Sequence, residues 1–107
     1  MDLALSGKIA MVSGASTGIG KAIARTLARE GAHLSLCART AADMGAVAED
    51  IQLELGAQCL ATSADLSNSD GVALWIERTF GIFGRVDILI NSAGGFPGGD
   101  FFAMSED

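Results

Sequence analysis

The stretch IAMVSGASTGIG, residues 9–20, decides the fold. A short apolar run, typical of a buried parallel strand, breaks into three glycines, and a helical pattern follows. Gly14 would allow the sharp exit from the strand, Gly18 a close approach to phosphates, and Gly20 tight packing of helix on strand. Because helix N-terminal amides favour an anion, the stretch predicts a strand, a phosphate-binding turn and a helix. The spacing departs from G-x-G-x-x-G, so for these residues alone a glycine-rich turn without a ligand stays an alternative.

Composition narrows the class of protein. The chain has 107 residues, half of them hydrophobic, and a net charge of −6, which suits one compact soluble domain or part of one. With 7 basic against 13 acidic residues, nucleic acid and anionic membrane are disfavoured as partners. The sequence shows no transmembrane run and no signal peptide, so we expect a cytoplasmic protein.

The cysteines and the histidine carry no metal or catalytic pattern. Cys37 and Cys59 lie in apolar segments without a C-x-x-C, so we expect buried thiols rather than ligands or a disulfide. His33 opens an apolar strand and is expected to be an ordinary surface residue. We therefore predict no metal site.

Strand-length apolar runs alternate with segments of helical period. We expect strands at residues 9–12, 34–38, 58–63 and 86–90, and helices at 18–30, at 41–55 and after a cap at Ser67 or Asn68. Right-handed crossovers then give a doubly wound α/β fold, a three-layer αβα arrangement with a parallel sheet in strand order 3-2-1-4. The first two helices would cover one face of the sheet and the third helix the other. In this strand order, the fourth strand would be an unpaired edge of the sheet.

The order of the strands also places a ligand crevice. The first and fourth strands flank the point where the strand order reverses, and ligands bind there in doubly wound sheets. Two glycine-rich segments, residues 14–20 and 91–95, follow those two strands. A nucleotide is therefore expected between them.

Three segments, SGASTGIG, ADLS and VDILINSAGG, resemble the short-chain dehydrogenase/reductase family, and in particular its 3-oxoacyl-ACP reductase-like members. The resemblance spans essentially the whole chain and implies the N-terminal portion of a Rossmann-like sheet. It further implies an NAD(P)(H)-dependent oxidoreductase that transfers a hydride between the nicotinamide and a small carbonyl or alcohol substrate. A ketone or 3-oxoacyl thioester reductase, assembled as a homo-oligomer of two or four subunits, is the implied parent enzyme. Sugar, steroid and polyol enzymes of the family look much alike in this part and stay alternatives.

The resemblance also implies roles for individual residues. Asp65 would accept a hydrogen bond from the adenine amine and Leu66 would contact the ring, although a turn or capping role for Asp65 stays an alternative. Two departures from the family pattern are visible: Ser13 stands for a threonine, and Ser92 stands for a second asparagine. We expect the second to loosen the local hydrogen bonds without touching the glycines. The full implied cofactor-binding set is Gly14, Ser16, Thr17, Gly18, Ile19, Gly20, Arg39, Asp65, Leu66, Asn91, Ala93 and Gly94.

The end of the second strand indicates which cofactor is preferred. A carboxylate there would bind the ribose hydroxyls of NAD, whereas a cation would attract the 2′-phosphate of NADP. The chain offers Ala38 and Arg39, so NADP(H) is favoured over NAD(H). One charged hydrogen bond of about 1.5–3 kcal/mol gives roughly a tenfold to hundredfold preference. Arg39 as a solvated helix-entry residue stays an alternative, and Thr17 weakens the preference because NADP-binding relatives often carry a basic residue there.

The family's catalytic residues have no counterpart here. The family uses a tyrosine as proton donor or acceptor, a lysine four residues later and a serine that orients the carbonyl. The chain has no tyrosine, and Lys8 and Lys21 stand in no Y-x-x-x-K. We therefore expect residues 1–107 to be the N-terminal dinucleotide-binding part of a single domain, inactive alone, with the catalytic serine, tyrosine and lysine beyond residue 107. A catalytically inert dinucleotide-binding or interaction module is the alternative.

The last residues support the same expectation. Residues 104–107 resemble an N-cap followed by acidic first-turn residues, which is how a helix begins. Phe96, Phe101 and Phe102 surround Pro97 in what reads as a loop beside the substrate site. They would line an apolar pocket or pack against the rest of the enzyme.

Overall fold

The computed structural model describes residues 5–15, 18–39, 41–92 and 101–104. Up to residue 91, helices and strands alternate as the sequence pattern predicts, and their bounds agree with the prediction to within about two residues. The elements in chain order are β1 (Ile9–Ser13), α1 (Gly18–Arg29), β2 (His33–Ala38), α2 (Ala41–Leu55), β3 (Cys59–Ser63), α3 (Ser69–Phe83), β4 (Ile88–Asn91) and β5 (Phe101–Met104).

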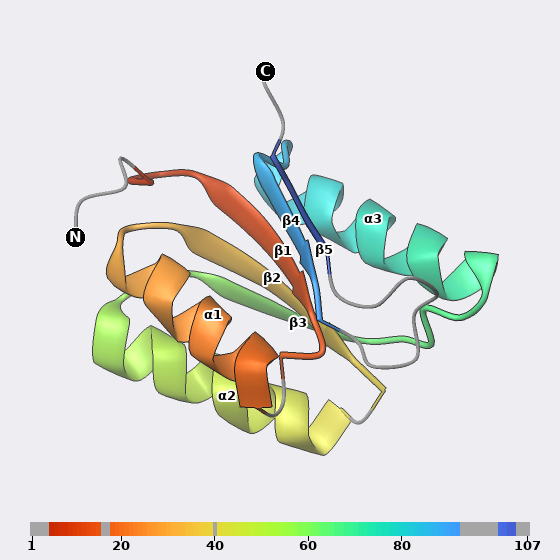
Figure 1. The fold of residues 1–107 in the computed structure, drawn as a ribbon, viewed down its shortest axis with the longest axis horizontal. Helices are drawn as coiled ribbons and strands as arrows, with labels where there is room; N and C mark the ends of the chain where they lie inside the picture. The colour runs from red at the N-terminus through yellow and green to blue at the C-terminus, as the bar shows by residue number, and fades with distance from the viewer. Residues whose placement is uncertain (1–4, 16–17, 40, 93–100, 105–107) are drawn as a thin grey trace.

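The sheet has the order β3-β2-β1-β4-β5, and its first four strands are parallel. Helices α1 and α2 lie on one face and α3 lies on the other (Figure 1). The predicted doubly wound arrangement with order 3-2-1-4 is therefore confirmed. Since β1 is central and all five of its residues are buried, it reads as a continuous apolar run rather than an alternating one.

The strand β5 corrects two expectations. Residues 101–104 pair antiparallel with β4, with Asn91 opposite Phe101, so β4 is not an edge strand. Phe101 and Phe102 lie in this strand and not in a loop, and Met104 is the last residue of the strand. The run FFAM is short and apolar and follows a segment rich in glycine, so its local pattern suits a packed loop as well as a strand. Phe96, Pro97 and residues 105–107 lie outside the described part of the chain.

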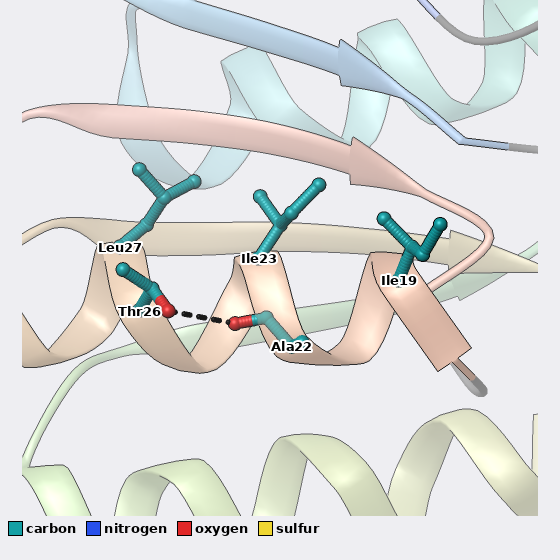
Figure 2. Close-up of a pocket in the computed structure, with 5 residues that line it drawn as sticks. All are labelled: Ile19, Ala22, Ile23, Thr26 and Leu27. Atoms are coloured by element: carbon teal, nitrogen blue, oxygen red, sulfur yellow. Dashed lines mark hydrogen bonds between the residues drawn. The ribbon is translucent and has the colours of Figure 1, made fainter.

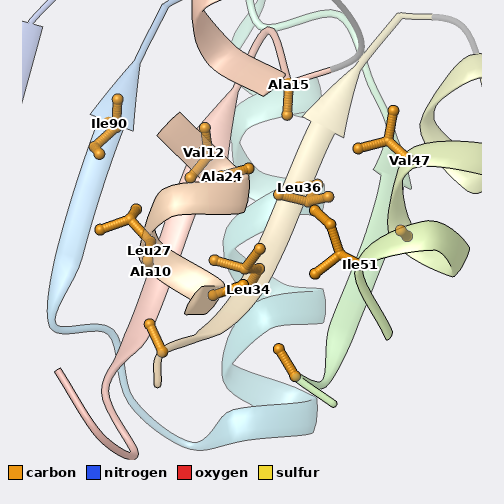
Figure 3. Close-up of a cluster of buried hydrophobic side chains, with 14 of the residues drawn as sticks. Ala10, Val12, Ala15, Ala24, Leu27, Leu34, Leu36, Val47, Ile51 and Ile90 are labelled. Atoms are coloured by element: carbon orange, nitrogen blue, oxygen red, sulfur yellow. The ribbon is translucent and has the colours of Figure 1, made fainter. Parts of the chain in front are cut away.

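The main core lies between the sheet and helices α1 and α2 (Figure 3). Leu34 and Leu36 of β2 and Ile51 of α2 are fully buried there. Helix α1 is amphipathic, since Ala24 and Leu27 are buried in this core. Apolar burial of this kind is worth about 1.5–3 kcal/mol for a large aliphatic side chain and fixes the helices on the sheet.

Helix α3 is fixed to the other face by buried polar contacts. The Trp75 indole N–H donates to Ser35 Oγ of β2 at 3.0 Å, and Ser35 Oγ lies 2.6 Å from Thr79 Oγ1. The helix begins with the side chain of Asn68 accepting from the Gly71 N–H at 2.8 Å, so Asn68 rather than Ser67 is the cap. It ends at Gly84, whose φ of 76° is the left-handed conformation that glycine tolerates.

The amino ends of β1 and β4 meet at a buried carboxylate. Asp87 accepts from the Ile9 N–H at 2.9 Å through Oδ2, and its own N–H donates to the Ile9 carbonyl at 2.8 Å. The Arg85 guanidinium also donates to this carboxylate. Burial alone would raise the pKa of Asp87, but the Arg85 and Ile9 hydrogen bonds and the charges of Arg85 and Lys8 outweigh it and hold the pKa below its usual value.

The cysteines and the histidine occupy structural positions. Cys37 is buried as predicted, whereas Cys59 is only half-buried; neither forms a disulfide, and burial raises the pKa of each thiol to about 11. His33 is partly exposed, and its Nδ1 accepts from the Gln58 N–H at 3.0 Å. His33 therefore links the start of β2 to the start of β3, which the sequence did not indicate.

Candidate functional site

The carboxyl ends of β1 and β4 lie side by side, as expected for the crevice. Ser13 is the register partner of Asn91, and its hydroxyl donates to Asn91 Oδ1 at 2.6 Å. Ser92 donates its N–H to Ser13 Oγ at 3.2 Å and its hydroxyl to the Ser13 carbonyl at 2.6 Å. The two glycine-rich segments of the sequence therefore start from strands joined by three side-chain hydrogen bonds.

The three glycines after β1 are needed for two different reasons, backbone conformation and lack of space. Gly14 and Gly18 have φ values of 65° and 56°, which L side chains rarely adopt, and the Gly14 N–H donates to the Cys37 carbonyl at 2.9 Å. Gly20 has no room for a side chain: an added Cβ would lie 2.1 Å from the Gly14 carbonyl oxygen and 2.5 Å from Ser92 Oγ. This is the tight helix-on-strand packing predicted for Gly20. The expectation that Ser92 does not touch the glycines is wrong.

Helix α1 begins directly after this turn. Ile19 is 67% exposed and does not join the core. Ile19, Ile23 and Leu27 point the same way from α1 and, with Ala22 and Thr26, line a shallow depression of about 270 Å³ (Figure 2). Ile19 is exposed because it stands in the first turn of the helix, at the end of this apolar stripe.

Arg39 follows β2, and its main chain is fixed by β3. The Ala64 N–H donates to the Ala38 carbonyl at 3.1 Å, and the Ser63 hydroxyl donates to the Arg39 carbonyl at 2.8 Å. The Arg39 side chain is 74% exposed, and its Nη2 lies 3.8 Å from Asp65 Oδ1. Sequence reasoning singled out Arg39 and Asp65 separately but missed their contact and the part played by Ser63. The sequence carries no signal for this contact, which depends on the parallel register of Ala38 with Ser63 in the structure.

Asp65 stands in the turn between β3 and α3. Its Oδ1 accepts from the N–H of Ser67 at 2.9 Å and from the Ser67 hydroxyl at 2.7 Å. The bond from the Ser67 hydroxyl contributes most to holding the pKa of Asp65 below its usual value. The bond from the Ser67 N–H and the positive charge of Arg39 act in the same direction. The turn role left open for Asp65 is therefore present. Leu66 beside it is half-buried against the cluster of Met11, Cys37 and Trp75 on the α3 face.

Taken together, the described candidate residues form two groups at one edge of the sheet. Gly14, Gly18, Ile19, Gly20 and Asn91 surround the ends of β1 and β4, whereas Arg39, Asp65 and Leu66 lie beyond the ends of β2 and β3. Ser16, Thr17, Ala93 and Gly94 lie outside the described residues.

The chemistry that these groups offer is recognition by main-chain N–H groups, one guanidinium and one carboxylate. In residues 5–15, 18–39, 41–92 and 101–104, no group of three or more His, Cys, Asp or Glu side chains is placed to hold a metal ion. The helices of that same part are all too short or too polar to cross a membrane.

Known proteins share both the sequence and the fold. The chain is 42% identical to the oxidoreductase UcpA of Escherichia coli K12 over 106 residues, which cover 96% of this chain and 38% of that protein. The structure of L-sorbose reductase from Gluconobacter frateurii complexed with NADPH and L-sorbose matches with a TM-score of 0.86 and 39% identity, over 88% of this chain and 36% of that one. A short chain dehydrogenase/reductase from Burkholderia phymatum in complex with NAD matches with a TM-score of 0.76 and 27% identity, over 79% and 30%.

These matches show which family the chain belongs to and how much of each relative it covers. It spans well under half the length of the relatives it matches. The family model for short chain dehydrogenases matches residues 8–107. The chain therefore belongs to the short chain dehydrogenase family.

Proposed function

We propose that residues 1–107 form the N-terminal, dinucleotide-binding part of a single Rossmann-fold domain in an NAD(P)(H)-dependent oxidoreductase. The observation that carries this proposal is the junction of β1 and β4, where Gly20 has no room for a Cβ beside the Gly14 carbonyl and Ser92. Such close packing brings the first N–H groups of α1 to the crevice at the strand-order reversal, where a pyrophosphate binds in doubly wound sheets.

The individual roles follow the positions of the residues. The turn of Gly14, Ser16, Thr17, Gly18, Ile19 and Gly20 would bind the phosphates and the adjoining ribose. Asp65 and Leu66 would bind the adenine, while Asn91, Ala93 and Gly94 would border the ribose on the nicotinamide side. Asp65 can keep its bonds to Ser67 in this role, because a carboxylate accepts several hydrogen bonds.

We further propose a preference for NADP(H). Ala38 leaves no carboxylate at the tip of β2 to bind the ribose hydroxyls of NAD, and the exposed Arg39 beside it offers a bidentate donor to a 2′-phosphate. The structures similar to this chain include one with NADPH and one with NAD, so the preference rests on Arg39 itself.

The hydride transfer belongs to the longer enzyme. Its substrate would be a small ketone, 3-oxoacyl thioester or the matching alcohol, and the serine, tyrosine and lysine that act on it would lie beyond residue 107. The parent enzyme would be a cytoplasmic homo-oligomer. The 107-residue chain alone would bind the cofactor without turning it over. A catalytically inert binding or interaction module is the second candidate, because no residue of the chain forms a Y-x-x-x-K.

Binding of the cofactor tests the proposal directly. Isothermal titration of the purified chain should show NADPH binding, and Arg39→Ala should weaken NADPH about tenfold or more while leaving NADH unchanged, because a charged hydrogen bond is worth about 1.5–3 kcal/mol. Arg29→Ala, which removes an exposed arginine in the last turn of α1, is the matched control. If neither dinucleotide binds, the interaction module is favoured instead.

A further inference from the structure

We propose that Ser63 and Asp65 set the cofactor preference by acting in opposite directions on Arg39. Ser63 positions Arg39 to meet a 2′-phosphate, and Asp65 opposes that contact as a competing partner. The inference rests on the proposed dinucleotide site and adds two residues that determine its selectivity.

Ser63 acts on the main chain of Arg39. Strands β2 and β3 end together at the register pair Ala38 and Ser63, and the ladder continues for one more bond, from the Ala64 N–H to the Ala38 carbonyl. The Ser63 hydroxyl adds a bond to the Arg39 carbonyl at 2.8 Å. It therefore holds the residue that follows the strand, where ladder bonds stop. Without this hydroxyl, the main chain of Arg39 loses the bond that holds it beside β3, and the guanidinium is less fixed in position.

Asp65 acts on the guanidinium. Its Oδ1 lies 3.8 Å from Arg39 Nη2, and both side chains are largely exposed, at 48% and 74%. The carboxylate is fixed in place by two hydrogen bonds from Ser67, so its negative charge stays where Arg39 reaches. To bind a 2′-phosphate, Arg39 must exchange this carboxylate for the phosphate, and the phosphate must approach a like charge. The uncharged 2′-hydroxyl of NAD neither has to displace the Asp65 carboxylate from Arg39 nor is repelled by its charge.

The size of each effect follows from its chemistry. Exposed ion pairs contribute little, so removing the Asp65 charge should shift the preference by about twofold to fivefold. Losing the Ser63 hydrogen bond should shift it by about twofold to tenfold the other way. Opposite signs from two neighbouring residues are not expected from general damage to the fold.

The test compares two fragments of the cofactor that differ by one phosphate, 2′,5′-ADP and 5′-AMP. The measured quantity is the ratio of their dissociation constants, in which an altered adenine contact cancels because both fragments carry adenine. Isothermal titration would be run on the wild-type chain and on S63A, S63T, D65N and T26A. Thr26 is the matched control, since its hydroxyl also donates to a main-chain carbonyl, that of Ala22 at 2.9 Å, on the exposed side of α1.

The expected preference for 2′,5′-ADP falls in S63A, returns in S63T, rises in D65N and stays unchanged in T26A. An unchanged ratio in S63A or D65N, a fall in D65N, or an S63A variant that weakens both fragments equally would overturn the inference while leaving dinucleotide binding intact. If the wild-type chain binds neither the fragments nor NADPH, the proposed function fails and the inference fails with it.

Discussion

The hydroxyl of Ser92 occupies the space that a side chain at position 20 would need. Ser92 Oγ donates to the Ser13 carbonyl, and it lies 2.5 Å from the point where a Cβ of residue 20 would be. The family pattern often has asparagine at position 92, so the sequence predicted that Ser92 would weaken the local hydrogen bonding. In the structure, the serine makes two hydrogen bonds to Ser13 and still leaves α1 close to β4.

Substitution of Gly20 separates the two contacts that exclude a side chain. Gly20→Ala should destabilise the protein by about 1–3 kcal/mol through overpacking, measured by urea unfolding. Adding Ser92→Gly should not restore stability, because the Gly14 carbonyl, 2.1 Å from the added Cβ, is main chain and remains.

The control for this experiment is another helical glycine. Gly45 of α2 has nothing within 4 Å of an added Cβ, so Gly45→Ala should stabilise by about 0.5–1 kcal/mol through helix propensity. Full recovery of stability in the Gly20→Ala/Ser92→Gly double variant would show that the serine, and not the main chain, is the limit.

Asp87 predicts a pH dependence of stability. Its pKa is lower in the folded protein than the usual value of about 3.9, so its contribution is present above that value and is lost as the pH falls through and below it. Asp87→Asn should lower the free energy of unfolding at pH 7 by about 1–3 kcal/mol, since Arg85 and the Ile9 N–H lose a charged acceptor.

Urea unfolding between about pH 3 and 7 checks this. The decline of stability toward acid should be shallower in Asp87→Asn than in the wild type. Asp50→Asn, which alters an exposed carboxylate on α2, should keep the wild-type decline. Equal slopes in all three proteins would contradict the role of Asp87.

Among the elements, α3 depends most on its ends and on a few buried polar contacts. Its side chain at the cap, Asn68, satisfies the Gly71 N–H, and Trp75 and Thr79 reach Ser35 of the sheet. Gly71 packs closely on the preceding turn, because an added Cβ would lie 2.0 Å from the Asp65 carbonyl oxygen. The cap therefore also fixes the turn that carries Asp65.

Removing the cap should be measurable. Asn68→Ala should lower the free energy of unfolding by about 1 kcal/mol, and Asn68→Asp should retain most of the stability because aspartate also caps well. Ser69→Ala, at the first residue of the helix, serves as the comparison. A loss in Asn68→Asp as large as in Asn68→Ala would show that the side-chain oxygen is not what matters.

The regular elements were predictable from the sequence because their patterns are local. Buried apolar runs gave the four parallel strands, and caps and glycines gave the helix ends, although only the geometry decided for Asn68 over Ser67. Strand β5 could not be found in this way. Its pairing with β4 is a contact between segments, and the short apolar run at residues 101–104 suits a packed loop as well as a strand.

At the scale of the whole molecule, the sequence predicted the contacts of the site that depend on strand order. It did not predict those that depend on the register between strands. The strand order brings Gly20 and Asn91 to one crevice, and the sequence pattern implies that order. The contacts of Arg39 with Ser63 and Asp65 depend on how β2 and β3 align residue by residue, which the sequence pattern does not specify.

The two faces of the sheet are covered unequally, which predicts a hierarchy of local stability. The α1 and α2 face carries the large apolar core, whereas the α3 face holds a small cluster around Trp75 and leaves Leu74, Phe80 and Ile82 partly exposed. Amide hydrogen exchange should therefore be slowest in β1 and β2 and faster in α3 than in α1. Equal protection of the two helices would contradict this.

The hydrogen bond between the side chains of Ser13 and Asn91 joins residues that are 78 positions apart, and this separation has a consequence during synthesis. At about 5–20 residues per second, a ribosome needs roughly 4–16 s to make the intervening chain. Throughout that interval, one side of β1 has no strand beside it, although all five of its residues are buried in the finished fold. The nascent chain thus keeps one edge of β1 unpaired until β4 emerges, and during this stage that edge is open to pairing with another chain.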